Sequence, residues 1–397
     1  MKKSWIVAAV GAASLVAAAL ATGLPAASAV SAKLHPAHVC KAVVAKGEAT
    51  CHALKMVNDK GVAPAAVAPP ASGLDPTELK SAYKLTGLSG GGRTVAIVDA
   101  YGYTNLERDL NVYRSQFGMT ACTQANGCLR IIDQNGGTAL PRMDLGWAQE
   151  QALDVDAVSA ACPDCKILVV QAKTPSFTNL GIAVDTAARQ PGVVAISNSY
   201  GGSDAPDSTY GAPYNHPGIA VTASTGDNGY QGGSFPASSS YVTAVGGTSL
   251  VAASGTARGW SESVWSGAGS GCSSYNVALA AASTFGTGCG KRAMADVSAA
   301  ADPSKGGLAV YYPASKTSST WGQFGGTSES APIIAAVYAL SGNTAGYANA
   351  LPYSHTASLF DVSTGSNGTC PTTQWCTARA GWDGPTGLGT PNGTGAF

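Results

Sequence analysis

The sequence predicts an α/β fold in which helices cover both faces of a parallel sheet. Four runs of apolar residues are typical of strands that are buried on both faces. These runs cover residues 94–100, 166–172, 193–200 and 219–224. Helical patterns alternate with them, at about 106–117, 145–161 and 179–189. Strands that alternate with helices are typical of a parallel sheet. Residues 250–325 are rich in Gly and Ser, and we expect long surface loops and short strands there.

The composition excludes several classes of protein. The 397 residues include 23 Lys and Arg against 23 Asp and Glu, so no strong field exists to attract nucleic acid or anionic lipid. Charged residues make up 12%, about half of the roughly 25% usual in soluble domains. A hydrophobic content of 45% supports a large core and excludes disorder for most of the chain. A low content of charged residues together with this hydrophobic content is typical of a secreted protein.

The N-terminus resembles a secretory signal peptide. Lys2 and Lys3 precede an apolar run over residues 5–24, and Ala27-Ser28-Ala29 provides small residues for cleavage. The run is nearly long enough to be a membrane anchor, which is the alternative. The cleavage signature favours removal of residues 1–29. We therefore expect an extracellular protein without a membrane anchor.

The ten cysteines agree with export, because they form five pairs of sequence neighbours. Nearest-neighbour pairing is the simplest proposal, although the sequence alone does not fix connectivity. The pairs are Cys40/Cys51, Cys122/Cys128, Cys162/Cys165, Cys272/Cys289 and Cys370/Cys376. The Cys-Pro-Asp-Cys spacing at 162–165 also permits a redox role, but a structural disulfide is favoured in an exported chain.

Residues 30–73 are predicted to be a short leader. They contain one small cysteine loop, followed by an Ala/Pro-rich stretch at 63–70 that is typical of an extended linker. The alternating strands and helices begin at about residue 74. We therefore expect the main domain to span residues 74–397.

A candidate nucleophile lies in Gly325-Gly326-Thr327-Ser328, just before an apolar helix at 333–340. A tight glycine turn exposes the Ser328 hydroxyl, and the N-terminus of the helix behind it favours negative charge. An ordinary helix cap is the alternative. A nucleophilic serine needs a base, and the histidines outside the leader are His216 and His355, both in loop-like surroundings.

Carboxylates offer another base. Glu150 and Asp154 are four residues apart in a predicted helix, so both project from one face. Such a pair splits its two pKa values when it shares a proton; two acids on a solvated helix are the alternative. Asp227 follows a predicted strand and Asp99 lies near the end of another, where active-site residues of parallel sheets gather. An ordinary Gly-Asp-Asn-Gly turn explains Asp227 equally well.

These pieces, in this order, resemble the sedolisins, serine-carboxyl peptidases with a subtilisin-like fold. The family's E-x-x-x-D helix is similar to residues 150–154, its S-x-G-D-x-G turn to 224–229, and its G-T-S-x-S-x-P motif to 326–332. Segments 197–202, 235–238 and 245–248 continue the resemblance, which runs from about Pro76 to the C-terminus. Each motif is weak alone, but together they are specific.

The resemblance implies a function for each motif residue. Ser328 is the nucleophile, Glu150 the base, Asp154 its proton-sharing partner, and protonated Asp227 an oxyanion donor. Asp99 extends the carboxyl network behind Asp154. Tyr200 and Gly201 are expected to border the substrate cleft. The implied enzyme is a secreted, acid-active endopeptidase that acts on proteins or peptides as a monomer.

The resemblance also implies one Ca²⁺ ion near the C-terminus. Its ligands would be the carboxylates of Asp361 and Asp383 with the carbonyls of Val362, Arg379 and Gly381, a set of hard oxygens that suits calcium. Two unrelated loop aspartates are the alternative.

The chain departs from the family pattern at four points. The leader is short for a family that usually carries a long folded propeptide, which puts its inhibitory role in doubt. Arg379 replaces a common Gly, Tyr200 a common Trp, and Glu329 a small residue after the nucleophile. Two other readings stay open, namely an inactive sedolisin-fold binding protein and a subtilisin-like hydrolase with a displaced His.

Overall fold

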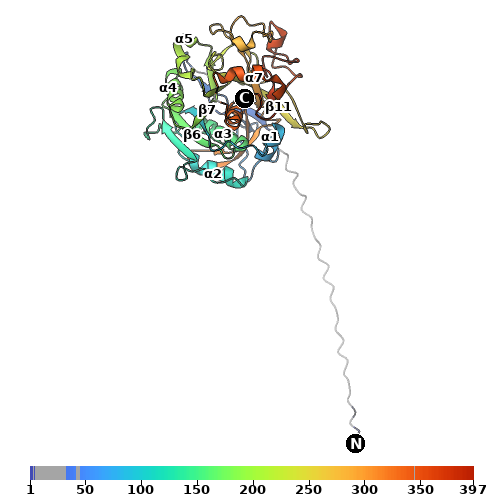
Figure 1. Ribbon diagram of the computed structural model, residues 1–397. Coiled ribbons are helices and arrows are strands. Elements are labelled where there is room, and N and C mark those ends of the chain that lie inside the picture. The colour runs from blue at the N-terminus through green and yellow to red at the C-terminus, as the bar shows by residue number, and fades with distance from the viewer. Residues whose placement is uncertain (3, 5–32, 42–44, 344) are drawn as a thin grey trace. The chain divides into compact units, whose positions relative to one another are not determined.

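The computed structural model describes residues 1, 2, 4, 33–41, 45–343 and 345–397 (Figure 1). The predicted signal peptide therefore lies almost entirely outside the described residues. Among the helices of the described chain, none combines the length and the apolar character needed to cross a membrane.

An eight-stranded sheet lies at the centre of the fold. Its order is β12-β11-β9-β7-β4-β6-β5, with β15 also paired to β11. All pairings are parallel except that of β11 with β12. The strands are β4 (Thr94–Ala100), β5 (Leu129–Asp133), β6 (Lys166–Ala172), β7 (Val193–Asn198), β9 (Ala220–Ser224), β11 (Thr243–Ala252), β12 (Trp260–Val264) and β15 (Val297–Ala300).

Helices cover both faces of this sheet. Helices α3 and α6 pack on one face, with α1 and α2 against α3, and α4 packs on the other face (Figure 1). Side chains alternate along β4, so Val95 and Ile97 join the core of α3 and α6 while Ala96 and Val98 join the core of α4. The helices are α1 (Pro76–Ala82), α2 (Leu106–Gln116), α3 (Leu145–Ala161), α4 (Phe177–Ala188), α5 (Asp207–Tyr210), α6 (Thr327–Ser341) and α7 (Leu351–Ser354).

The predicted fold class is confirmed, and the differences in detail have physical reasons. Strand β11 was not predicted because Gly246 and Gly247 weaken the pattern of a strand. Both glycines are needed there. A Cβ added to Gly246 would lie 2.0 Å from the Pro385 carbonyl oxygen, and a Cβ added to Gly247 would lie 2.6 Å from the Ala301 methyl. Strand β5 was not predicted because the exposed Arg130 interrupts its apolar run. The predicted strand at 193–200 breaks at Ser199, after which β8 leaves the central sheet.

Smaller sheets bring the N-terminal segment into the body of the molecule. One has the order β1-β3-β17-β16 and another the order β10-β8-β2. Residues Leu34–Phe397 therefore form one compact unit, which includes the described part of the predicted leader at 30–73. The strands are β1 (His35–His38), β2 (Thr50–Cys51), β3 (Leu54–Val57), β8 (Tyr200–Ser203), β10 (Ser234–Phe235), β16 (Leu308–Pro313) and β17 (Ser319–Gly325). Two further pairs are β13 (Gly271–Cys272) with β14 (Ala293–Met294), and β18 (Leu359–Phe360) with β19 (Thr390–Pro391).

All five nearest-neighbour disulfides predicted from the cysteine spacing are present. Each closes a short loop, from 3 residues for Cys162–Cys165 to 17 residues for Cys272–Cys289. The sulfurs at 162 and 165 are thus bonded to each other and do not offer a metal site with Asp164. The Cys40–Cys51 disulfide lies wholly within the N-terminal segment.

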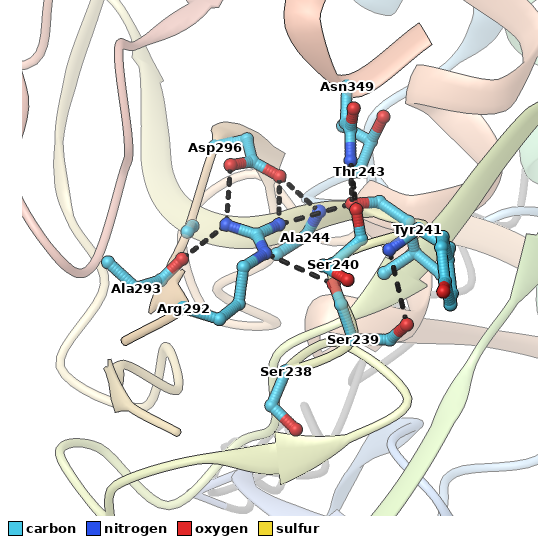
Figure 2. A network of polar contacts seen from close by, with 12 residues as sticks. Ser238, Ser239, Ser240, Tyr241, Thr243, Ala244, Arg292, Ala293, Asp296 and Asn349 are labelled. Carbon is cyan, nitrogen blue, oxygen red and sulfur yellow. Dashed lines mark hydrogen bonds and ion pairs between the residues drawn. The ribbon is translucent and has the colours of Figure 1, made fainter. Parts of the chain in front are cut away.

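A buried ion pair between Arg292 and Asp296 holds the segment that precedes β11 in place through hydrogen bonds to its backbone (Figure 2). The Arg292 guanidinium donates to both carboxylate oxygens of Asp296, at 2.8 and 2.5 Å, and also to the carbonyls of Ser239 and Val242. The backbone N–H of Ala244 donates to Asp296 at 2.7 Å. Because charge this deeply buried must be fully paired, these bonds fix where β11 begins.

Candidate active site

Helix α3 carries two of the predicted acids into the interior. It is capped by Asp144, which accepts a hydrogen bond from the Trp147 N–H at 3.1 Å, and it is buried along nearly its whole length. Glu150 and Asp154 are both fully buried and lie on the same face of the helix, one turn apart. The alternative of a solvated acidic helix is therefore wrong.

Burial sets the charge of these carboxyls. It raises the pKa of Glu150 well above its usual value, and the neighbouring Asp154 raises it further. Burial likewise raises the pKa of Asp154. Asp99, at the end of β4, has its pKa raised by burial and then by Asp154 and Glu150, and neither of its oxygens has a hydrogen-bond partner among the described residues. Burial and the charges of neighbouring acids thus favour the protonated forms of these three carboxyls.

Ser328 lies in the first turn of α6, which begins earlier than the predicted helix at 333–340. Gly326 precedes the helix with φ of 96°, a conformation that favours glycine. The Ser328 hydroxyl donates to the Ser199 carbonyl at 3.2 Å, and the Ser199 hydroxyl donates to Asp154 at 2.8 Å. Contact with the Ser328 hydroxyl also opposes the rise in the pKa of Glu150. The nucleophile, Glu150 and Asp154 thus share one buried site.

Asp227 reaches the same site from the turn after β9. One carboxylate oxygen accepts hydrogen bonds from the Thr327 N–H at 2.7 Å and the Thr327 hydroxyl at 2.9 Å. The other oxygen, Oδ2, has no partner among the described residues. Burial raises the pKa of Asp227 to about 7. Below that pH, Asp227 has a proton to donate from a position beside the N-terminus of α6.

A segment of the N-terminal region runs through this site. Strand β2 pairs antiparallel with β8, with Thr50 opposite Gly201 and Cys51 opposite Tyr200. Beyond it, β3 pairs antiparallel with β17, with Leu54 opposite Gly325. We call residues 50–55 the leader strand. It pairs with β8 and β17 of the body in an extended form, as a peptide does when it adds a strand to the edge of a sheet.

Two backbone amides of the leader strand bond to the site. The His52 N–H donates to the Ser199 carbonyl at 3.2 Å, and the Ala53 N–H donates to Glu150 Oε2 at 2.8 Å. The His52 ring is buried, with Nδ1 2.7 Å from the Ser224 hydroxyl. Burial, with a smaller contribution from His38, lowers the pKa of His52 to about 3. The ring is therefore neutral over most of the acid range.

The two residues expected to border the cleft do so through their backbones. Gly201 lies against the His52 ring, where an added Cβ would come within 2.6 Å of Cε1. The Tyr200 side chain instead points into the core, and its hydroxyl donates to Asn198 at 2.7 Å. Glu329 is also fully buried and accepts from the Leu308 N–H at 3.3 Å, so it does not face the leader strand.

The histidines considered as displaced bases lie elsewhere. His216 contacts the Pro213 carbonyl at 2.9 Å and Asp185 at 3.2 Å. His355 contacts the Leu351 carbonyl. Neither contacts Ser328, Glu150 or Asp154 among the described residues, so the geometry does not support a His-dependent base.

The C-terminal aspartates lie close together. Burial raises the pKa of Asp383 to about 7, and the charge of the neighbouring Asp361 adds a smaller contribution. Asp361 accepts from the Gly381 N–H at 2.9 Å, and Asp383 accepts from the Arg379 N–H at 3.3 Å. The Arg379 guanidinium turns away and donates to the Trp382 carbonyl at 2.8 Å. In the described chain, neither carboxylate has a cationic side chain within 4.0 Å, so this pair of acids fits a bound cation.

Sequence reasoning missed the leader strand and Ser199. Extended segments that pair with the edge of a cleft need only a free backbone, so the sequence 50–55 carries no distinctive signal. The nearby Cys40/Cys51 loop was the one available hint, because it places a rigid element just before His52.

Comparison with known proteins agrees with this geometry. The model of the subtilase family matches residues 143–357, more than half of the chain. Kumamolisin from Bacillus sp. (strain MN-32) is 31% identical over 362 residues, which cover 80% of this chain and 62% of kumamolisin. Sedolisin from Pseudomonas sp. (strain 101) is 26% identical over 380 residues, covering 85% of this chain and 63% of that protein. The chain therefore spans less than two thirds of the length of these relatives.

A solved structure shares the fold. Pseudomonas sedolisin, a serine-carboxyl proteinase complexed with two molecules of pseudo-iodotyrostatin, superposes with a TM-score of 0.69 and 25% sequence identity. The alignment covers 81% of this chain and 96% of that one. The subtilisin-like architecture predicted from the sequence is thereby confirmed.

Proposed function

Because the chain belongs to the subtilase family and is sedolisin-like in sequence and fold, we propose that it is a secreted, acid-active serine-carboxyl endopeptidase. One observation carries the proposal: Ser199 joins the Ser328 hydroxyl to Asp154 in a site with buried carboxyls, and no histidine ring contacts Ser328 in the described part of the chain. Protein and peptide chains are its substrates.

The mechanism begins at the nucleophile. The Ser328 Oγ attacks the carbonyl carbon of the substrate and gives its proton to Glu150. Asp154 shares a proton with Glu150 and orients it, as an aspartate orients histidine in a Ser/His/Asp triad. Asp227 donates its proton in a hydrogen bond to the oxyanion, together with the N-terminus of α6. Glu150 then protonates the leaving amine, and water releases the acyl group.

Acid activity follows from the requirement for bound protons. Asp227 donates only while it is protonated, and burial places its pKa at about 7. The Glu150/Asp154 pair must hold one proton between them. We therefore expect activity to be highest in acid and to fall as the pH rises toward neutral.

We further propose that Asp361 and Asp383 bind one Ca²⁺ ion, together with the carbonyls of Val362, Arg379 and Gly381. When bound, the ion links the β18 end of this region to the loop before β19 and stabilises the native state. Support comes from the two adjacent carboxylates that lack a cationic partner in the described chain. The ion has no part in the chemistry at Ser328.

Digestion of denatured casein between about pH 3 and 7 tests the proposed activity. We expect digestion in acid, and we expect Ser328→Ala to reduce it by about 10³-fold or more without altering the circular dichroism spectrum. The fold is kept because loss of one hydroxyl leaves no cavity of consequence. Normal digestion by a folded Ser328→Ala protein would refute the serine mechanism. Digestion that persists in His216→Ala and His355→Ala separates this mechanism from a His-dependent one.

A further inference from the structure

A cavity beside the cleft gathers three cationic residues from distant parts of the sequence. It has a volume of about 690 Å³, and its lining includes Arg142, Lys173 and Lys316. We call this cavity the basic hollow. In the described chain, none of the three cations has a carboxylate within 4.0 Å. The hollow therefore carries unpaired positive charge in a chain whose cations and acids are otherwise balanced.

Backbone contacts hold the three cations at the hollow. The Gly102 N–H donates to the Arg142 carbonyl at 3.0 Å. The Lys173 N–H donates to the Gln134 side chain at 2.7 Å. Lys316 lies in the turn between β16 and β17. All three residues are exposed, so a charged group that enters the hollow can reach them.

The lining has a single acid among the described residues, Asp144, and that acid is already engaged. Asp144 accepts a hydrogen bond from the Trp147 N–H at 3.1 Å and so caps helix α3. Three positive charges against one negative charge leave an excess of two around the hollow. Because like charges that lie close together repel one another, this arrangement favours a ligand of negative charge.

A strained residue borders the hollow. Tyr101 has φ of 60°, a left-handed conformation that is rare for a bulky side chain. Its N–H donates to the Ala172 carbonyl at 2.7 Å, and its carbonyl accepts from the Gln151 side chain at 3.2 Å. Gln151 follows Glu150 in α3, so the helix with the proposed base also fixes the edge of the hollow. Backbone strain of this kind persists where contacts maintain it and is common at ligand sites.

The basic hollow continues toward the cleft. An adjoining cavity of about 340 Å³ shares Tyr101 with it and is also lined by Thr50 and Pro175. Thr50 pairs antiparallel with Gly201 of β8, two residues along that strand from Ser199. A peptide that pairs with β8 in the same sense therefore passes the basic hollow on the N-terminal side of the residue beside Ser199.

From this arrangement we infer that Arg142, Lys173 and Lys316 form a specificity site for substrates with a carboxylate side chain on the N-terminal side of the cleaved bond. The inference rests on the proposed function and names a substrate class for it. One exposed ion pair changes binding by less than about 5-fold, but three cations together support a preference of about 10-fold. The cations act on binding of the substrate and take no part in the chemistry at Ser328.

The test uses the purified full chain at pH ~5.5, where a glutamate of the substrate is ionised and Asp227 still holds its proton. Mass spectrometry first locates the fastest cut in denatured casein. Peptides that span this cut then carry Glu, Gln or Lys in turn at the second to the fifth residue before it. At one or more of these positions we expect kcat/KM to be about 10-fold higher with Glu than with Gln, and lowest with Lys.

A triple variant assigns the preference to the basic hollow. Arg142→Gln, Lys173→Gln and Lys316→Gln together should bring the Glu/Gln ratio to about 1, while cleavage of the Gln peptide changes by less than about 2-fold. The matched control replaces three exposed lysines elsewhere, by Lys60→Gln, Lys291→Gln and Lys305→Gln. It removes the same net charge and should keep the 10-fold preference.

The outcomes separate the inference from the proposed function. Casein digestion with Glu and Gln peptides cleaved equally at every position would overturn the inference and leave the proposed function standing. A Glu preference that persists in the triple variant, or that the control also loses, would overturn it as well. Loss of Gln-peptide cleavage in a folded triple variant would show that these cations do not act by charge selection, with the same result. Absence of casein digestion by the parent chain would overturn both proposals together.

Discussion

Replacing His52 with glutamine isolates the effect of acid on the leader strand. The ring is neutral in the folded chain because burial lowers its pKa to about 3, whereas the unfolded residue titrates near ~6.5. Among the charged groups near it, His38 lowers the pKa further, while Glu150 and Asp227, whose own pKa values are raised by burial, lie beside its backbone. Ser224 is its hydrogen-bond partner. Glutamine keeps a hydrogen-bonding side chain that does not titrate.

The sign and size of the effect follow from these two pKa values. Since the folded pKa is lowered, the contribution of His52 to stability is fully present above pH ~6.5 and is lost as the pH falls toward ~3. Each pH unit in this window is worth about 1.4 kcal/mol. At pH ~4.5 the loss of stability is about 2.7 kcal/mol. If the free energy that holds the leader strand in place is smaller than this, the strand undocks first and the loss equals that free energy.

Urea unfolding of the Ser328→Ala chain measures this loss without interference from cleavage. The buried carboxyls act in the opposite direction, since their raised pKa values favour the native state at low pH. The informative quantity is therefore the difference in the free energy of unfolding between the chain with His52→Gln and the Ser328→Ala parent. This difference should change by about 2.7 kcal/mol between pH ~7.5 and ~4.5. His35→Gln, at a half-exposed position on β1, is the matched control and should show no such shift. A difference for His52→Gln that stays constant with pH would refute the reasoning.

Three further predictions concern other parts of the molecule. Asp227→Asn should slow casein digestion by about 10-fold or more, yet it should move the descending limb of the pH profile to higher pH, because an amide donates a hydrogen bond at every pH. A descending limb at the same pH as in the parent would contradict the oxyanion role. Chelation should lower the melting temperature by about 3–4 °C if the ion is bound at ~100 times its Kd, and calcium should restore it; an unchanged melting curve counts against the Asp361/Asp383 site. Asp296→Ala should cost about 3–5 kcal/mol in urea unfolding because it leaves Arg292 buried without its partner, whereas a loss below ~1 kcal/mol would show that water reaches this pair.

The sequence predicted the layers of the fold well, because its strongest signals are periodic and local. Strands β4 and β6 and helix α3 were predicted with the bounds that the structure has, since long apolar runs and helical spacing depend on neighbouring residues alone. Strand β11 was missed because its glycines are there to make room for Pro385 and Ala301, which lie far away in the sequence. Long-range packing of this kind leaves no local pattern.

The same distinction between local and long-range features applies to the candidate site. The spacing of Glu150 and Asp154 and the turn at Ser328 are local features, so the acids and the nucleophile were identified before their contacts were known. Burial of these acids, on which their pKa values depend, required the packing of α3 against the sheet and α6. The place of His52 in the site was not predictable, because the residues that hold it, Ser199 and Ser224, are more than 140 positions away.

The position of the Cys40–Cys51 disulfide has a consequence for reversibility. Both cysteines precede His52, and none of the five disulfides joins the two sides of the His52–Ala53 bond. While the chain is intact, the leader strand competes for the cleft at an effective concentration of about millimolar or above, whatever the protein concentration. If the chain were cut after His52, the residues up to His52 would become a separate molecule, and their occupancy of the cleft would depend on how much of that fragment remains in the surrounding volume.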